Sequence, residues 1–164
     1  MRLLLPDAAA TEVLGAALAA SLADGAGAIV HLRGELGAGK TALVRALLRG
    51  LGVRETIRSP TYTLLDTYRA GEWICVHVDL YRLQVRREVD ELGLRDLIGA
   101  STLLLIEWPE RGFDALPPPD LLLQLEYDGD GRRACVEAGS AVGLRWLHHL
   151  GQDTRLSPYL SNLT

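Results

Sequence analysis

The chain has 164 residues, of which 48% are hydrophobic and 23% are charged, and its formal net charge is −4. This length and composition indicate one globular domain with a substantial core, and they exclude a disordered or fibrous chain. The negative charge disfavours a broad, non-specific nucleic-acid surface, although it allows a local arginine patch.

The start of the chain predicts a strand and a helix. Arg2–Leu5 is a short strand candidate that ends at Pro6 and Asp7. Either Asp7 or Thr11 could begin the helix that follows over residues 8–23. The apolar positions of this helix mark one face and are Val13, Leu14, Ala17, Leu18 and Leu22.

The next segment contains the strongest functional signal. Residues 24–27 break the helix, residues 28–32 predict a buried strand, and residues 42–51 predict a second helix. Between this strand and helix, the G-x-x-x-x-G-K-[ST] pattern of a phosphate-binding P-loop is formed by Gly34, Glu35, Leu36, Gly37, Ala38, Gly39, Lys40 and Thr41. A glycine-rich turn needs no ligand, but the order of strand, loop and helix is the context that this motif requires.

The residue types of the loop suit a nucleotide with Mg²⁺. Its glycines let backbone N–H groups point inward at a helix N-terminus, where they can bind phosphate. Lys40 is the single lysine among 17 basic residues, and its compact ammonium can reach the β- and γ-phosphates. The Thr41 hydroxyl suits Mg²⁺, which takes one or two protein oxygens beside those of the phosphates. We therefore expect nucleotide contacts from Glu35, Leu36, Gly37, Ala38, Gly39, Lys40, Thr41 and Ala42.

The middle of the chain departs from a plain alternation of strands and helices. Residues 54–61 are polar and charged, and we interpret them as a loop. Residues 62–68 and Trp73–Asp79 are rich in β-forming residues and are joined by a short turn, which predicts a hairpin. Residues 85–97 have helical spacing that is interrupted at Gly93.

The last third predicts a central strand, a second hairpin and a helix. Residues 102–106 are a continuous apolar run, which is typical of a strand covered on both faces. Prolines 117–119 form a rigid turn. Residues 121–127 and 132–137 then predict a hairpin, and residues 140–150 predict a short helix.

Together these elements predict an α/β fold of the P-loop NTPase type. In this fold, a mostly parallel central sheet is flanked by helices and carries antiparallel hairpin additions. Residues 1–150 would form one P-loop ATPase domain, and residues 151–164 would form a C-terminal tail. Because residues 152–164 have no clear period, we expect this tail to be loosely attached.

Cysteine usage and hydropathy favour a soluble cytoplasmic protein. Cys75 and Cys135 are isolated in apolar or strand-like runs, so we expect buried free thiols rather than a disulfide or a metal pair. The first seven residues lack the length and cleavage site of a signal peptide, and no apolar run approaches 18 residues. We therefore expect no membrane association.

Two carboxylates are candidates for the acidic residue that a P-loop NTPase needs at the end of a neighbouring strand. Glu107 directly follows one predicted strand, and Asp79 ends another. Each could instead cap the next helix or face solvent, but we favour a role at Mg²⁺ or its water because both have the required setting. Glu110, three residues further on, is explained equally well as a solvated loop charge.

A switch segment is predicted between the P-loop helix and the strand that ends at Asp79. Ser59 and Thr61 place two hydroxyls there, where a loop could sense the γ-phosphate. The alternative is an ordinary Ser-Pro turn.

Three other residues allow two interpretations each. Trp108 could pack over the nucleotide, although an aromatic residue beside a strand often belongs to the core. His31 and His77 lie in predicted strands, and we interpret them as satisfied core histidines rather than ligands.

The sequence lacks the motif of a guanine-specific site. A guanine-specific site usually carries an Asn-Lys-x-Asp loop, but the single asparagine is Asn162 and the single lysine is Lys40. A regulatory GTPase is therefore disfavoured.

Four segments occur in a distinctive order and spacing. They are the P-loop, Ser59-Pro60-Thr61-Tyr62-Thr63-Leu64, His77-Val78-Asp79-Leu80-Tyr81-Arg82 and Glu107-Trp108-Pro109-Glu110. Over residues 4–150 this combination resembles the bacterial TsaE family, the ATPase components of tRNA threonylcarbamoyladenosine synthesis. Because four motifs agree, the resemblance is far more specific than the P-loop alone.

The resemblance implies Mg-ATP in the P-loop, with Thr41 and Glu107 near the metal. It makes Lys40, Asp79 and Glu107 the candidate catalytic residues, with Asp79 important for hydrolysis. Further nucleotide contacts are implied at Thr11 and Arg132 and are expected at Trp108. The resemblance also implies TsaD- and TsaB-type partners, with tRNA met indirectly through the complex.

We interpret the chain as a small ATPase that is slow alone and acts as an accessory subunit of a tRNA-modifying complex. Little chain remains to build a lid and an acceptor site, and no Ser-His-Asp or Cys-His arrangement is evident. A small-molecule kinase, with Asp79 as the base, is the main alternative. A binding module in which ATP only sets a conformation is a third possibility.

Overall fold

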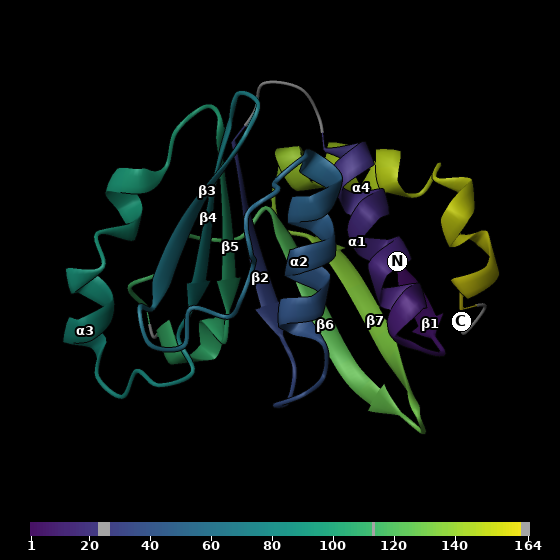
Figure 1. Ribbon diagram of the computed structural model, residues 1–164, viewed down its shortest axis with the longest axis horizontal. Coiled ribbons are helices and arrows are strands. Elements are labelled where there is room, and N and C mark those ends of the chain that lie inside the picture. The colour runs from purple at the N-terminus through teal and green to yellow at the C-terminus, as the bar shows by residue number, and fades with distance from the viewer. Residues whose placement is uncertain (23–26, 113, 162–164) are drawn as a thin grey trace.

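The computed structural model describes residues 1–22, 27–112 and 114–161, which form one mixed sheet with helices on both faces (Figure 1). The strands of this part run in the order β1-β7-β6-β2-β5-β4-β3. Their bounds are β1 Arg2–Leu5, β2 Ala28–Arg33, β3 Leu65–Ala70, β4 Trp73–Asp79, β5 Thr102–Glu107, β6 Leu121–Asp128 and β7 Gly131–Ala138. The helices are α1 Ala8–Ser21, α2 Lys40–Leu51, α3 Arg86–Glu91 and α4 Ala141–Leu150, with 3₁₀ segments at Leu94–Leu97, Pro109–Gly112 and Thr154–Tyr159.

The centre of the sheet is parallel. β2 lies between β5 and β6 and runs parallel to both, and β4 is parallel to β5. Antiparallel pairs join β3 to β4, β6 to β7 and β1 to β7. This arrangement confirms the predicted fold class, a mostly parallel centre with two antiparallel hairpins added to it.

Separate hydrophobic cores cover the two faces of the sheet. Alternation along β5 sends Leu103 and Leu105 to the core that includes α1, α2 and α4, whereas Leu104 and Ile106 face the core that includes α3. Figure 1 shows α1 and α2 side by side across one face, and α3 beyond β3 and β4. Because both faces are covered, every residue of β5 is buried, as its unbroken apolar sequence predicted.

Both helices that flank the P-loop strand begin at well-defined residues. Asp7 is the N-cap of α1, since its Oδ1 accepts a hydrogen bond from the Ala10 amide at 2.8 Å. α1 ends at Ser21, and the predicted helix end and break at residues 23–26 lie outside the described residues. α2 begins at Lys40, two residues earlier than predicted, because Gly39 with its φ of 106° ends the loop.

Two segments in the middle of the chain are shorter than predicted. β3 begins at Leu65 rather than at residue 62, because Leu64 has a φ of 64° and its amide bonds back to the Pro60 carbonyl at 2.6 Å. The helical pattern of residues 85–97 forms α3 and a 3₁₀ segment, and Gly93 with a φ of 61° separates them. The interruption at Gly93 is therefore confirmed.

The expectation of a loosely attached C-terminal segment is wrong for its described part. Residues 154–159 form a 3₁₀ segment, and Leu156 is fully buried in the core beside α1 and α4. Leu160 forms an antiparallel bridge with Leu3, and the Ser161 amide donates to the Arg2 carbonyl at 3.0 Å. One buried leucine and a few backbone bonds anchor this segment, so no hydrophobic period was available to predict it.

Both cysteines are free thiols, but only Cys75 is buried, and burial raises its pKa to about 11. Cys135 is half-buried, because it lies on the face of β7 opposite Ala134 and Val136, which belong to the core. In the described ranges, the structure contains no helix that is both long and apolar enough to span a membrane.

His31 is buried on β2, but its Nε2 has no hydrogen-bond partner among the described residues, contrary to the expectation of a satisfied histidine. Burial and the positive charge of Arg33 lower the pKa of His31 to about 4, against the effect of a hydrogen bond with the Pro117 backbone. The His31 imidazole therefore binds a proton near pH 6.5 in the unfolded chain, whereas in the folded chain it binds the proton only near pH 4.

Because protonation of His31 favours the unfolded chain, we expect the neutral His31 ring to contribute fully to the stability of the fold above pH 6.5. We expect this contribution to be lost as the pH falls toward 4. The loss amounts to at most about 3 kcal/mol of unfolding free energy. Urea unfolding at pH 7.5 and 4.5 measures it, with His31→Gln as the variant that lacks the titrating ring. An equal fall in stability for the parent and His31→Gln would contradict this prediction.

Candidate functional site

The register of the parallel strands brings the predicted site residues to one edge of the sheet. Glu107 at the end of β5 is paired with Leu32 of β2 on one side and with Asp79 of β4 on the other. The P-loop begins directly after β2, so its residues lie beside both carboxylates. Strand ends that are 28 residues apart in the sequence, at Asp79 and Glu107, are thus neighbours in space.

The P-loop encloses an open space in front of the N-terminus of α2. Gly39 has a φ of 106°, and no heavy atom of a described residue beyond its chain neighbours lies within 4 Å of the position that a Cβ atom there would take. The adjoining pocket has a volume of about 340 Å³. It is lined by Leu36, Gly37, Gly39, Lys40, Thr41, Ala42, Ser59, Thr61, Asp79, Tyr81, Glu107 and Trp108. This group contains most of the residues that the sequence predicted for the site.

Lys40 reaches back across the loop. Its Nζ donates hydrogen bonds to the carbonyls of Gly34 at 2.6 Å and Glu35 at 2.9 Å. The same ammonium lies 3.8 Å from the centre of the Trp108 ring, which is a cation–π contact. Burial lowers the pKa of Lys40, whereas nearby carboxylates, Glu107 first among them, act to raise it.

Glu107 is held by hydroxyl and imidazole groups. Thr41 Oγ1 donates to both carboxylate oxygens, at 2.9 Å to Oε1 and 3.1 Å to Oε2. His77 Nε2 lies 2.8 Å from Oε1, and the side chains of His77 and Glu107 are only 0% and 2% exposed. Sequence reasoning assigned His77 to the core and missed this contact. Its alternation with Asp79 on β4, which places both on one face, was the available signal.

The predicted switch hydroxyls lie against Asp79. Ser59 Oγ donates to Asp79 Oδ2, and the hydroxyls of Ser59 and Thr61 are 2.6 Å apart. The Tyr81 amide donates to the other oxygen, Oδ1, at 2.9 Å. The loop that follows α2 is therefore tied by its side chains to the end of β4.

Trp108 lines the P-loop pocket. Its φ is 58°, an uncommon value for a bulky residue, and its amide donates to the Leu32 carbonyl at 3.2 Å. Its ring is 4.9 Å from the ring of Tyr81 and also covers the Lys40 ammonium. Glu110 lines an adjacent hollow together with Trp108 rather than the P-loop pocket itself.

Thr11 and Arg132 line a second hollow on the outer side of the P-loop, together with Gly37, Ala38, Gly39 and Ala42. Thr11 is buried, and its hydroxyl is 3.5 Å from the Asp7 carbonyl. Arg132 Nε donates to the Ala38 carbonyl at 3.2 Å, and its Nη2 donates to the Gly37 carbonyl at 3.3 Å. These two residues, distant in the sequence, are thus adjacent to the loop.

Tyr127 also contacts the P-loop, and sequence reasoning did not identify it. Its hydroxyl donates to the Leu36 carbonyl at 2.8 Å, and the Arg132 guanidinium lies 4.1 Å from the centre of its ring. The hairpin β6–β7 is therefore hydrogen-bonded to the P-loop through Tyr127 and Arg132. An aromatic residue at the end of a strand, beside a turn, was the only sequence signal for this contact.

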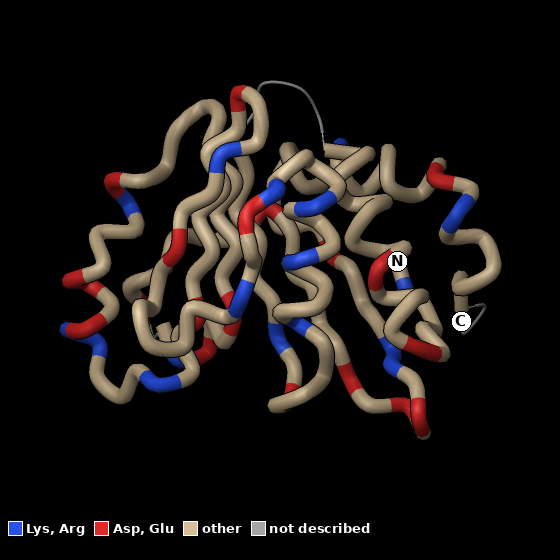
Figure 2. The backbone as a smooth tube through the Cα atoms, in the orientation of Figure 1, with Lys and Arg blue, Asp and Glu red and all other residues tan. Residues whose placement is uncertain are grey.

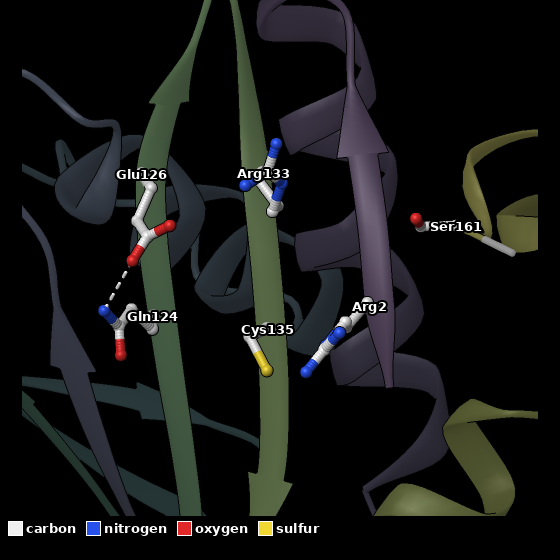
Figure 3. A pocket seen from close by; sticks show the side chains of 6 residues that line it. All are labelled: Arg2, Gln124, Glu126, Arg133, Cys135 and Ser161. Atoms are coloured by element: carbon white, nitrogen blue, oxygen red, sulfur yellow. Dashed lines mark hydrogen bonds between the residues drawn. The ribbon is translucent and has the colours of Figure 1, made fainter. Parts of the chain in front are cut away.

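A separate hollow lies on the face of β6, β7 and β1 that carries Cys135 (Figure 3). It is lined by Arg2, Gln124, Glu126, Arg133, Cys135 and Ser161. Gln124 Nε2 donates to Glu126 Oε1 at 2.8 Å, and Arg133 forms an ion pair with Asp128 at 3.2 Å. Since this hollow contains none of the predicted site residues, we assign no role in nucleotide chemistry to it.

The donor set of the P-loop pocket fits a nucleotide with a hard divalent cation. The open loop at Gly39 offers backbone N–H groups and helix-terminus dipoles to phosphate, and Lys40 adds a positive charge. The Thr41 hydroxyl and the Glu107 carboxylate supply the oxygen ligands that Mg²⁺ prefers.

Comparisons with known proteins identify the family of this chain and agree with its fold. The family described as "Threonylcarbamoyl adenosine biosynthesis protein TsaE" matches residues 5–135. The chain is 40% identical over 115 residues to the tRNA threonylcarbamoyladenosine biosynthesis protein TsaE of Haemophilus influenzae, covering 70% of this chain and 73% of that protein. It is 44% identical over 115 residues to the protein of that name from Synechocystis, covering 68% and 71% of the two chains.

A further relative and a solved structure extend the similarity. The TsaE protein of Bacillus subtilis is 33% identical over 120 residues, which cover 73% of each protein. The crystal structure of YdiB from Bacillus subtilis matches 93% of this chain and 94% of its own, with a TM-score of 0.74 and 24% sequence identity. The match to the YdiB structure shows a similarity of fold.

Proposed function

The chain belongs to the TsaE family of tRNA threonylcarbamoyladenosine biosynthesis, and we propose that it binds and hydrolyses Mg-ATP as an accessory subunit of the modifying complex. The observation that carries this proposal is the position of Lys40, Thr41 and Glu107 around the open P-loop. In a P-loop site, phosphate recognition and charge neutralisation are most of what the protein must provide.

Each residue at the sheet edge has a role in this proposal. Backbone N–H groups of the P-loop bind the phosphates, and Lys40 exchanges the carbonyls of Gly34 and Glu35 for phosphate oxygens. Thr41 and Glu107 would hold Mg²⁺, which would neutralise charge on the phosphates. Asp79 orients the attacking water or accepts its proton, because it lies beside Glu107 at the same edge.

The nucleoside is proposed to lie on the outer side of the P-loop. The hollow lined by Thr11 and Arg132 adjoins Gly37, Ala38 and Gly39, so a nucleotide with its phosphates in the loop can extend into it. Arg132 and Tyr127 already bind loop carbonyls, which holds the loop's outer side in place. Trp108 covers the opposite side of the pocket, over Lys40.

The loop before β3 is proposed to report the state of the nucleotide. Ser59 contacts Asp79 and Thr61 contacts Ser59, so a γ-phosphate or its loss can act on this loop through the Asp79 carboxylate. The consequence would be tight association with TsaD- and TsaB-type proteins in the ATP state and release in the ADP state, with tRNA met through the complex. Such a complex would operate in the cytoplasm.

We expect the protein to co-elute with its TsaB- and TsaD-type partners in the presence of a non-hydrolysable ATP analogue. In the presence of ADP, the amount that co-elutes should be about tenfold lower. Thr61→Ala should reduce this difference, because it removes one hydroxyl from the cluster at Asp79. Thr67→Ala, an exposed position on β3 away from the pocket, is the matched control.

Three results, from this experiment and from assays of tRNA modification and of phosphate transfer, would contradict parts of the proposal. Equal association in ATP and ADP would remove the switch while leaving ATP binding intact. Sustained tRNA modification without this protein would remove the proposed function. Transfer of labelled γ-phosphate to a metabolite would instead identify a small-molecule kinase.

A further inference from the structure

His77 is a buried imidazole that contacts only one described polar side chain. It is fully buried on β4, and its Nε2 lies 2.8 Å from Glu107 Oε1. Its other nitrogen, Nδ1, is buried and has no hydrogen-bond partner among the described residues. Burying a polar imidazole costs free energy that an apolar side chain of similar size would not cost. A role beyond packing would therefore explain why His77 contacts Glu107.

The geometry of the sheet fixes this contact. His77 is paired with Leu105 of β5, and Glu107 lies two residues further along that strand, on the same face. Asp79 is the next residue of β4 on this face and is paired directly with Glu107. The imidazole therefore approaches Glu107 from within the sheet, while Thr41 approaches it from α2.

The direction of the hydrogen bond follows from the partners. An ionised carboxylate can only accept, so His77 Nε2 carries the hydrogen and donates it to Glu107 Oε1. Nδ1 then carries no hydrogen and can only accept. Its lack of a partner therefore means an unused acceptor rather than a buried N–H group without an acceptor. Hydrogen on Nε2 is thus the arrangement that the contact with Glu107 requires.

We propose that His77 is a positioning residue that keeps the Glu107 carboxylate aimed at the metal site; this inference rests on the proposed function. Thr41 now donates to both oxygens of Glu107, whereas His77 donates to Oε1 alone. When the Thr41 hydroxyl turns to a metal ion, His77 is the donor that remains on Glu107. It would hold Oε1 in place and leave Oε2 available as a metal ligand.

The test uses His77→Leu, which removes the donor at similar volume, and His77→Gln, whose amide can donate from nearly the same position. We expect His77→Leu to weaken Mn²⁺ binding to the ATP-loaded protein about tenfold or more, with a similar loss in kcat. KM for ATP and metal-free ATP affinity should change by less than about twofold, because the P-loop contacts remain. His77→Gln should recover most of both losses.

His31→Leu is the matched control, since it alters a buried histidine on β2 that is paired with Ile106 and therefore lies on the other face of the sheet from Glu107. Parent-like Mn²⁺ affinity and kcat in His77→Leu would overturn the proposal, and so would equal losses in His77→Leu and His77→Gln. If the parent itself bound no ATP, the proposed function would fail rather than this inference.

A second measurement needs no variant. In the parent protein, ¹⁵N–¹H correlation spectra of the imidazole should show a hydrogen on His77 Nε2 that persists when Mg-ATP is added. Its loss, or its transfer to Nδ1 on loading, would overturn the proposal even if His77→Leu did not fold.

Discussion

Replacing Glu107 by glutamine is expected to lower ATP hydrolysis about a hundredfold or more, which corresponds to about 3 kcal/mol in the barrier. The amide keeps the size of the side chain and an oxygen that can accept from Thr41 and His77, so the fold should survive. It removes the negative charge that a divalent cation requires. Phosphate release under saturating Mg-ATP measures the effect, and the melting temperature should move by only a few degrees.

Two further carboxylate variants sharpen this result. Asp79→Asn should also lose most of its hydrolysis, because Asp79 faces the same pocket beside Glu107. Glu110→Gln is the control, since this carboxylate is exposed and lines the adjacent hollow. If Glu107→Gln and Asp79→Asn both hydrolysed ATP at the parent rate, these residues would serve only to end their strands.

Lys40→Ala is expected to weaken ATP binding at least about tenfold. A charge-assisted hydrogen bond to phosphate contributes about 1.5 to 3 kcal/mol, which accounts for a loss of this size. Lys40→Arg should bind weakly as well, because a planar fork replaces a compact ammonium that is buried between two loop carbonyls and Trp108. Isothermal titration of the folded variants with ATP measures the change.

The control for this charge change is Arg49→Ala, on the same helix and far from the P-loop. Arg49 is exposed and donates to the Val53 carbonyl at 2.7 Å. We expect ATP affinity within about twofold of the parent for this variant. Unchanged affinity in Lys40→Ala would show that the P-loop does not bind the phosphates.

The strand ends and the P-loop could be predicted because local sequence determines them. A run of apolar residues that is closed by a carboxylate marks a buried strand with a polar end, as at β5 and Glu107. Parallel strands bring such ends to one edge, so the sequence alone predicts that Asp79 and Glu107 are neighbours, and the register of β4 and β5 confirms it. Glycine spacing likewise predicted the loop, since Gly39 needs a positive φ.

The remaining contacts depend on register and packing, which one sequence does not reveal. The approach of His77 to Glu107 needs the offset of β4 against β5, and the approach of Tyr127 to the P-loop needs β6 beside β2. The start of β3 was placed three residues early because Tyr62 has strand propensity, whereas a turn from Pro60 to Leu64 overrides it. Leu156 was missed because a single buried residue leaves no pattern.

The order of the strands has a consequence for how quickly the chain reaches its native state. β2 occupies the middle of the sheet, yet its neighbours β5 and β6 follow much later in the sequence, since Ala28 pairs with Leu103 and Val30 with Leu121. Strands can pair with β2 only after long segments of the chain have closed into loops. Closing such loops costs conformational entropy, whereas a local helix forms without this cost. The P-loop can therefore take its final shape only after most of the chain has collapsed. Folding should be slow for a domain of this size, and its rate should be limited by the docking of β5 and β6 onto β2.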